Sequence, residues 1–255
     1  MSENSLQNQS SSSVLPSPAS WVTFVPALPF RLPGAVLWLA SMIGVQWLAH
    51  YATEQGHLSI PMGWPSFSLH AGIMLLWSFA LIAWTLSKRK PLWALGISLR
   101  QVPGDIAFGL IACVAMGAFY LLAGGAVRLY FELFNEAPAA VFRDFLYQSA
   151  YGEVTVWHIL GVVLFYPIFE ELWFRGVLYA GLRSEQGRIP AILLSAIFFA
   201  LAHSNTIPIN QFFGGLVFAI AYEYRRTLLA PILLHIAGNG ALVVLGRMLP
   251  HLGIE

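Results

Sequence analysis

Three apolar stretches in the second half of the chain carry polar side chains that are rare inside a membrane. They read Glu170-Glu171-x-x-x-Arg175, Phe199-x-x-x-His203 and His235-x-x-x-Asn239. An ionised side chain at mid-bilayer costs about 2.5–3.5 kcal/mol on insertion scales, so such groups mark candidate functional sites. At about 1.5 Å per helical residue, the polar groups on the three stretches lie about 10–22 Å deep and can meet in one layer.

Helical spacing gives the two glutamates different surroundings. Glu171 and Arg175 are four residues apart, so they share a helix face and can form an ion pair. Glu170 points about 100° away around the helix and has no local counter-charge, so we expect it to face a cavity. His235 and Asn239 are also four residues apart and present both side chains to one space. We therefore expect Glu170 to be reactive and the Glu171–Arg175 pair to be structural.

These residue types suit the activation of a water molecule. Glu170 can act as a general base, and His203 can share the water or pass a proton to a leaving group. Asn239 and an N–H of His235 can donate to an oxygen that becomes negatively charged, an effect worth roughly 3–4 kcal/mol per donor in hydrolases that depend on it. The set predicts catalysis by a Glu/His-activated water.

Metal chemistry is the alternative. Glu170, His203 and His235 are also a two-histidine, one-carboxylate set that could hold Zn²⁺ with an open coordination position. The sequence has no His-Glu-x-x-His helix, and a route without metal is available. We therefore favour a site without a cofactor. A serine hydrolase is disfavoured, because no Gly-x-Ser-x-Gly elbow occurs and only Ser204 adjoins a motif.

The composition indicates that membrane helices hold these residues. Apolar residues make up 58% of the 255 and charged residues 10%, against roughly 25% charged in an average soluble domain. Thirteen Lys and Arg against twelve Asp and Glu leave a net charge of +1, with no broad cationic face for nucleic acid. We expect an all-α, polytopic membrane bundle that contacts the lipid bilayer and does not bind nucleic acid.

Hydropathy rises in seven blocks separated by polar residues or by Pro and Gly. The predicted spans are 34–52, 67–87, 104–128, 156–182, 188–203, 208–223 and 228–249. We expect about seven transmembrane helices, within a range of six to eight. The fifth and sixth blocks would cover only about 24 Å, less than the roughly 30 Å of the hydrocarbon layer, so they are short, tilted or joined as a broken hairpin.

The remaining segments complete the expected organisation. Residues 1–20, rich in Ser, Asn and Gln, predict a disordered tail, and 21–255 a single transmembrane bundle with its catalytic core at about 156–249. Residues 129–155 predict an interfacial helix or a lid. Asp105 and Glu223 fall at span ends, where we expect solvent to be near, and no role is assigned to them.

Basic residues near the span ends predict the orientation. With a cytoplasmic N-terminus, nine of the thirteen Lys and Arg lie in inner loops and three on the outer side. Because cytoplasmic loops carry an excess of Lys and Arg, this asymmetry favours a cytoplasmic N-terminus and seven crossings.

Together, the three motifs resemble those of the CAAX protease and bacteriocin-processing family of intramembrane endopeptidases (CPBP, also called Abi). Phe174-Arg175-Gly176, the Phe213-Gly-Gly stretch and the Ile-Leu-Leu before His235 fit as well. The resemblance covers about residues 160–245. Each motif is weak alone, but three in order on separate spans are specific.

The resemblance implies a membrane-embedded cavity with Glu170 and His203 on a water and His235 and Asn239 facing the scissile carbonyl. Glu171 and Arg175 are supporting members of the family motif. It further implies a peptide or protein substrate that is membrane-associated or lipidated, and a multi-pass location in a bacterial cell membrane.

Two other classes of function remain open. A non-catalytic immunity or scaffold protein would keep the bundle without turnover, although the intact motifs count against it. A transporter is a weaker option, supported only by charge inside the membrane.

Overall fold

All the elements that the structure describes are helices. The structure is a computed structural model and describes residues 31–59, 68–99, 101–134, 156–203 and 209–248. The elements are α1 (Leu32–Glu54), α2 (Ser68–Ser87), a 3₁₀ turn η1 (Leu92–Leu95), α3 (Val102–Phe134), α5 (Val156–His158), a π-helix η2 (Ile159–Phe165), α6 (Tyr166–Glu171), a π-helix η3 (Leu172–Tyr179), α7 (Ala180–Gln186), α8 (Arg188–Ala202), α9 (Ile209–Arg225) and α10 (Leu229–Met248). The predicted all-α fold is confirmed, and most helix ends fall within two or three residues of the predicted spans.

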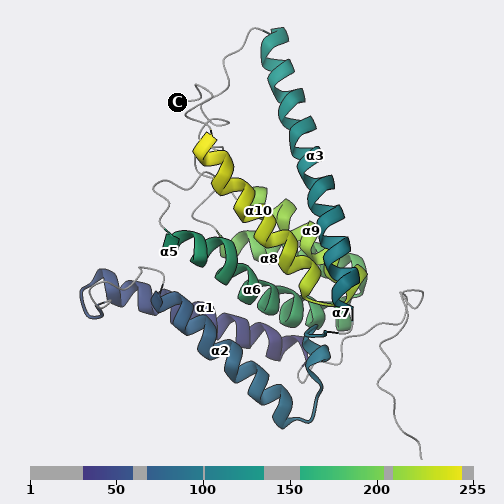
Figure 1. The fold of residues 1–255 in the computed structure, drawn as a ribbon. Coiled ribbons are helices and arrows are strands. Elements are labelled where there is room, and N and C mark those ends of the chain that lie inside the picture. Colours follow the sequence, from purple (N-terminus) through teal and green to yellow (C-terminus); the bar gives the residue numbers. More distant parts are fainter. Residues whose placement is uncertain (1–30, 60–67, 100, 135–155, 204–208, 249–255) are drawn as a thin grey trace, which may run out of the picture.

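Among the described residues, two helices are long and apolar enough to cross a membrane, by length and composition. They are α1 and the stretch Leu69–Ser87 of α2. Apolar stretches of α3 (Val102–Ala118), α8 and α10 (Leu229–Val244) are shorter. In Figure 1, α1 and α2 lie side by side on one flank, and α8, α9 and α10 form the opposite part of the bundle.

The helical rod from α5 to α7 runs without a break between these two parts (Figure 1). The short α6 segment, which carries Glu170 and Glu171, lies between the two π-helical segments. Pro167, in the first turn of α6, has no N–H to donate to the preceding turn. Because π-helical turns are rare and are frequently found at functional sites, the backbone of this part of the rod is unusual.

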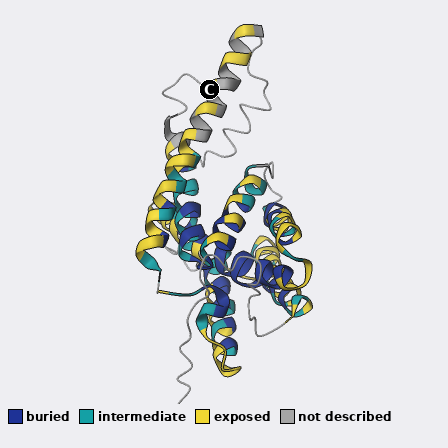
Figure 2. Cartoon of the chain, turned by 90° about the vertical axis from the view of Figure 1, so that its right-hand side faces the viewer, coloured by how far each residue is buried: buried dark blue, intermediate teal, exposed yellow. Residues whose placement is uncertain are grey.

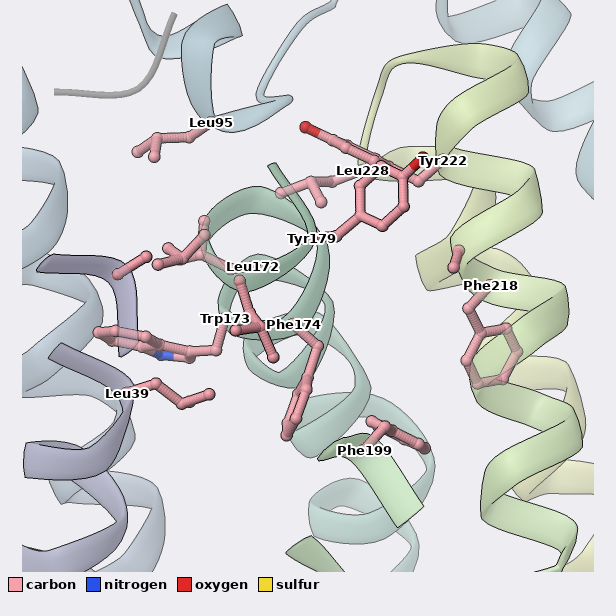
Figure 3. Packing of buried hydrophobic residues seen from close by; sticks show 14 of the residues in the cluster. Leu39, Leu95, Leu172, Trp173, Phe174, Tyr179, Phe199, Phe218, Tyr222 and Leu228 are labelled. Atoms are coloured by element: carbon pink, nitrogen blue, oxygen red, sulfur yellow. The ribbon is translucent and has the colours of Figure 1, made fainter. Parts of the chain in front are cut away.

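The π-helix η3 is the centre of the core. Every residue from Glu171 to Arg183 is buried. Figure 3 shows Trp173 beside Leu39 of α1, and Phe174 beside Phe199 of α8. The rings of Phe174 and Phe199 meet edge to face at 5.0 Å.

Stacked indole rings join the α1–α2 pair to this centre. Trp38 of α1 stacks on Trp84 of α2 at 5.2 Å and on Trp173 of η3 at 6.5 Å. The indole N–H of Trp173 donates to the hydroxyl of Ser78 at 3.0 Å, inside the core. The first two helices therefore buttress the rod that carries the candidate site.

The long helix α3 packs mainly on α10 and projects beyond it (Figure 1). Its 33 residues span about 50 Å, more than the roughly 30 Å of a hydrocarbon layer. In Figure 2 the projecting part is exposed, and its outward residues include Leu122, Leu129 and Leu133. Residues 129–134, predicted to belong to a separate interfacial helix or lid, are therefore the end of α3. Residues 135–155 and the predicted tail 1–20 lie outside the described residues.

The expectation that Asp105 and Glu223 lie near solvent is wrong. Asp105 is fully buried and accepts hydrogen bonds from Arg225 at 2.7 Å and Thr227 at 2.6 Å. Glu223, 1% exposed, accepts one from the hydroxyl of Tyr179 at 2.6 Å. Tertiary packing encloses these span ends.

The connection between α2 and α3 closes the same end of the bundle. Leu95 of η1 is fully buried, and the carbonyl of Gly96 accepts the N–H of Leu228 at 2.9 Å. The loop lies so close to η3 that a Cβ on Gly176 would stand 2.7 Å from the carbonyl oxygen of Leu95. Gly176 is therefore needed for the close approach of loop and rod.

We expect Gly176→Ala to destabilise the fold by about 1–3 kcal/mol, the usual cost of overpacking a close-packed contact. The matched control is Gly44→Ala in α1, where an added Cβ meets nothing within 4 Å. Thermal unfolding in detergent measures both variants. Equal stability of the two variants would contradict the close contact.

Candidate active site

Glu170 lies between two histidines that come from different helices. Its Oε1 is 3.7 Å from Nε2 of His203, which follows the last residue of α8, and its Oε2 is 3.6 Å from Nε2 of His235 in α10. The side chain of Glu170 is 17% exposed and that of His203 31%. The structure thus brings together three residues that the sequence analysis selected from three separate stretches, and leaves His203 and Glu170 partly exposed.

The hydrogen-bond partner of Nδ1 determines which ring nitrogen of each histidine carries the hydrogen. Nδ1 of His203 is 2.8 Å from the carbonyl oxygen of Phe199. Nδ1 of His235 is 2.8 Å from Oε1 of Glu171. Both partners are acceptors, so each Nδ1 carries a hydrogen. In a neutral ring, Nε2 then offers its lone pair toward Glu170.

Glu171 forms the predicted ion pair with Arg175 and also contacts His235. Nη1 of Arg175 donates to its Oε1 at 2.9 Å, and the same oxygen accepts the Nδ1–H of His235. Both members of the pair are fully buried. Glu171 therefore orients a histidine of the site in addition to neutralising the arginine.

The guanidinium of Arg175 also contacts α8 and α9. Nη2 donates to the carbonyl of Gly215 in α9 at 3.0 Å. The group also lies over the rings of Phe199 and Phe218, 4.7 and 5.3 Å from their centroids, at the range of cation–π attraction. Arg175 thus joins the rod to α8 and α9.

Asn239 reaches the rod through a backbone carbonyl. Its Nδ2 donates to the oxygen of Val162 in η2 at 2.8 Å. In π-helical register the donor to that oxygen would be the residue five positions on, which is Pro167 and has no N–H. Asn239 therefore supplies a hydrogen bond that the helix cannot make itself, and its amide retains a second N–H.

Sequence reasoning missed the backbone partners of this centre. The carbonyls of Phe199, Gly215 and Val162 hold His203, Arg175 and Asn239 respectively. Two of the three had a signal in the sequence. Phe199 lies four residues before His203, and Gly215 belongs to the Phe213-Gly-Gly stretch, where a Cβ would stand 3.0 Å from Cα of Ala196 in α8.

The donor types at this centre also bear on the zinc alternative. Both histidines direct Nε2 at Glu170 while Nδ1 binds an acceptor, an arrangement common among histidines that ligate metals. Within the described residues, however, no group of three or more His, Cys, Asp or Glu side chains is arranged to hold a metal ion.

The fold and the buried centre define a class, a helical protein with helices apolar enough to cross a membrane and a glutamate between two histidines. Comparison with known sequences shows which family this region resembles. The model of the "Type II CAAX prenyl endopeptidase Rce1-like" family matches residues 152–241, which contain all three motifs. The predicted resemblance to the CAAX protease and bacteriocin-processing family is confirmed over this part of the chain.

Two relatives give the extent of the similarity. The membrane-embedded CAAX protease MroQ of Staphylococcus aureus (strain USA300) is 34% identical over 92 residues, which are 33% of this chain and 37% of that protein. An uncharacterized 24.3 kDa protein of Escherichia coli is 28% identical over 200 residues, 75% of this chain and 86% of its own. The match to MroQ thus spans little more than a third of that relative's length. No solved structure matches.

We expect Arg175→Met to destabilise the protein by about 3–5 kcal/mol, because it leaves the buried charge of Glu171 without its partner. The double variant Glu171→Gln with Arg175→Met leaves no charge unpaired and should recover part of that loss. Thermal unfolding measures all variants. As a control, Arg31→Met removes an exposed arginine and should cost about 1 kcal/mol or less. A double variant less stable than Arg175→Met would contradict the charge argument.

Proposed function

We propose that this protein is an intramembrane endopeptidase that hydrolyses a peptide bond with a water activated by Glu170 and His203. The observation that carries the proposal is the position of Glu170 between two histidine Nε2 atoms, in a largely buried centre built from the three family motifs. The substrate is a membrane-associated or lipidated protein, by analogy with a family described as prenyl endopeptidases and a relative named a CAAX protease.

The formal charge of the centre depends on the protonation of its two histidines. Glu170 and Glu171 with Arg175 carry a formal charge of −1 when both histidines are neutral. The ring of His235 donates its Nδ1–H to Glu171, and when the ring is protonated it also carries an Nε2–H that can donate to the substrate.

The proposed reaction then follows from the positions of these groups. Glu170 accepts a proton from the water while the water oxygen bonds to the scissile carbonyl carbon, and the C=O electron pair moves onto oxygen. Nε2–H of His235 and the second amide N–H of Asn239 donate to that oxyanion. When the C–N bond breaks, the proton on Glu170 passes through His203 to the leaving amine.

The membrane arrangement is part of the proposal. Seven crossings with a cytoplasmic N-terminus, in a bacterial cell membrane, agree with the helix ends and with the excess of Lys and Arg in the inner loops. In this arrangement the buried network of Tyr179, Arg183 and Glu223 lies at the cytoplasmic end.

Glu170→Gln should lower turnover by about 100- to 10,000-fold, the usual contribution of a general base, with little change in melting temperature. Purified wild-type and variant protein are incubated with candidate membrane substrates, and the released peptides are identified by mass spectrometry. The matched control is Glu54→Gln, at an exposed glutamate of α1. Retention of more than a few per cent of wild-type hydrolysis would remove Glu170 from the role of base, and absence of hydrolysis by the wild type would favour the non-catalytic alternative.

Strong chelation followed by desalting should change neither activity nor melting temperature, because the proposed reaction needs no metal. Elemental analysis should find less than one zinc per chain. If activity is lost and only Zn²⁺ restores it, Glu170, His203 and His235 are ligands of a zinc-dependent version of the protease.

A further inference from the structure

Phe218 of α9 places its ring flat against a histidine of the candidate site. The ring centroids of Phe218 and His235 are 4.6 Å apart, and the two planes differ by 21°. The side chain is buried, and Figure 3 shows its ring directed from α9 into the core. Phe218 belongs to none of the three sequence motifs, and no step of the proposed reaction uses it.

The neighbours of Phe218 hold its ring in place. Helical side chains lean toward the N-terminus over the preceding turn, and here that turn carries Gly214. A Cβ on Gly214 would stand 3.5 Å from Cε2 of Phe218, an ordinary packing distance. Phe199 meets the ring nearly at right angles at 6.2 Å, and the guanidinium carbon of Arg175 lies 5.3 Å from its centroid. In a close-packed interior such a ring has little room to move.

The hydrogen bond to Glu171 does not fix the plane of the His235 ring by itself. It holds one atom, Nδ1, at 2.8 Å from Oε1 of Glu171. The outer torsion of a histidine side chain is broad, so the ring can still tilt about that contact. The flat face of Phe218 restricts this tilt. With both restraints, Nε2 of His235 points toward Oε2 of Glu170 at 3.6 Å.

We propose that Phe218 is a positioning residue, which holds the imidazole of His235 in the orientation where Nε2 faces the reacting groups. The inference rests on the proposed function, in which the Nε2–H of His235 donates to the oxyanion. A hydrogen bond weakens steeply when its angle departs from linear, and a misplacement of about 1 Å can cost about 100-fold in rate. Phe218 acts through His235 and needs no contact with the substrate.

Phe218→Leu keeps an apolar side chain and removes the flat ring. We expect kcat to fall about 10- to 100-fold, less than the roughly 100- to 1,000-fold that follows complete loss of an oxyanion donor. KM should stay within about twofold of wild type, because ground-state binding is not affected. Phe218→Tyr keeps the flat ring and should recover most of the lost kcat. The released peptides are measured at a temperature where all variants are folded.

The matched control is Phe108→Leu in α3. The ring of Phe108 stacks on Tyr224 at 5.3 Å and 17°, and the guanidinium carbon of Arg225 lies 6.0 Å from its centroid. This repeats the arrangement at Phe218, a stacked ring beside an arginine, with a tyrosine in place of the histidine. Phe108→Leu should lower the melting temperature and leave kcat unchanged. Equal losses of kcat in the two leucine variants would contradict a specific role of Phe218.

Nuclear magnetic resonance of the labelled histidine rings tests the stack without any substrate. Ring protons that lie over an aromatic face resonate upfield, and the signals of His235 are identified by their absence from His235→Gln. We expect them upfield in wild type and in Phe218→Tyr, and shifted downfield in Phe218→Leu. The same signals in wild type and Phe218→Leu would overturn this inference.

The kinetic outcomes separate this inference from the proposed function. If wild-type protein hydrolyses its substrate and Phe218→Leu has the same kcat, or only a raised KM, the role of Phe218 is wrong and the proposed function stands. Absence of hydrolysis by the wild type would overturn the proposed function and this inference with it.

Discussion

One carboxylate oxygen, Oε1 of Glu171, holds the candidate site together. It accepts a hydrogen bond from Arg175 and another from His235, all at full or nearly full burial. Arg175 extends this link to the carbonyl of Gly215, so a single buried ion pair connects the rod with α9 and α10. Because each of these charges would be strongly unfavourable alone in a low-dielectric interior, the helices are held in one relative arrangement.

The packing around η3 also fixes the position of the segment that carries Glu170 and Glu171. Trp173 stacks toward α1, Phe174 meets Phe199 of α8, and Gly176 admits the loop at Leu95, so three successive sides of η3 contact three different elements. Two π-helical segments change the rotation of the rod on either side of Glu170 and Glu171. Glu170 thereby faces His203 and His235, while Glu171 lies in the core against Arg175 and Nδ1 of His235.

The two adjacent glutamates have different charged partners. Glu171 is neutralised by Arg175 and fixes the ring of His235, whereas in the described part of the chain the close ion-pair partners of Glu170 are His203 and His235. Oε1 of Glu171 already accepts hydrogen bonds from both Arg175 and His235, so this oxygen is occupied by structural partners. A carboxylate between two titratable rings can exchange protons with them, which is the property that the proposed hydrolysis requires.

The sequence alone was enough for the helical class, the helix ends to within a few residues, and the residues of the centre, because hydropathy blocks and four-residue spacings are local properties. It also predicted the Glu171–Arg175 pair, whose members are neighbours on one helix. Only the tertiary structure showed that His235 contacts Glu171. It also showed that Asn239 donates to the carbonyl of Val162, for which Pro167 provides no backbone donor. Finally, it showed that Asp105 and Glu223 are buried, although they lie at span ends where solvent was expected. Each of these depends on contacts between helices distant in sequence, and the packing of distant helices cannot be deduced from a local pattern.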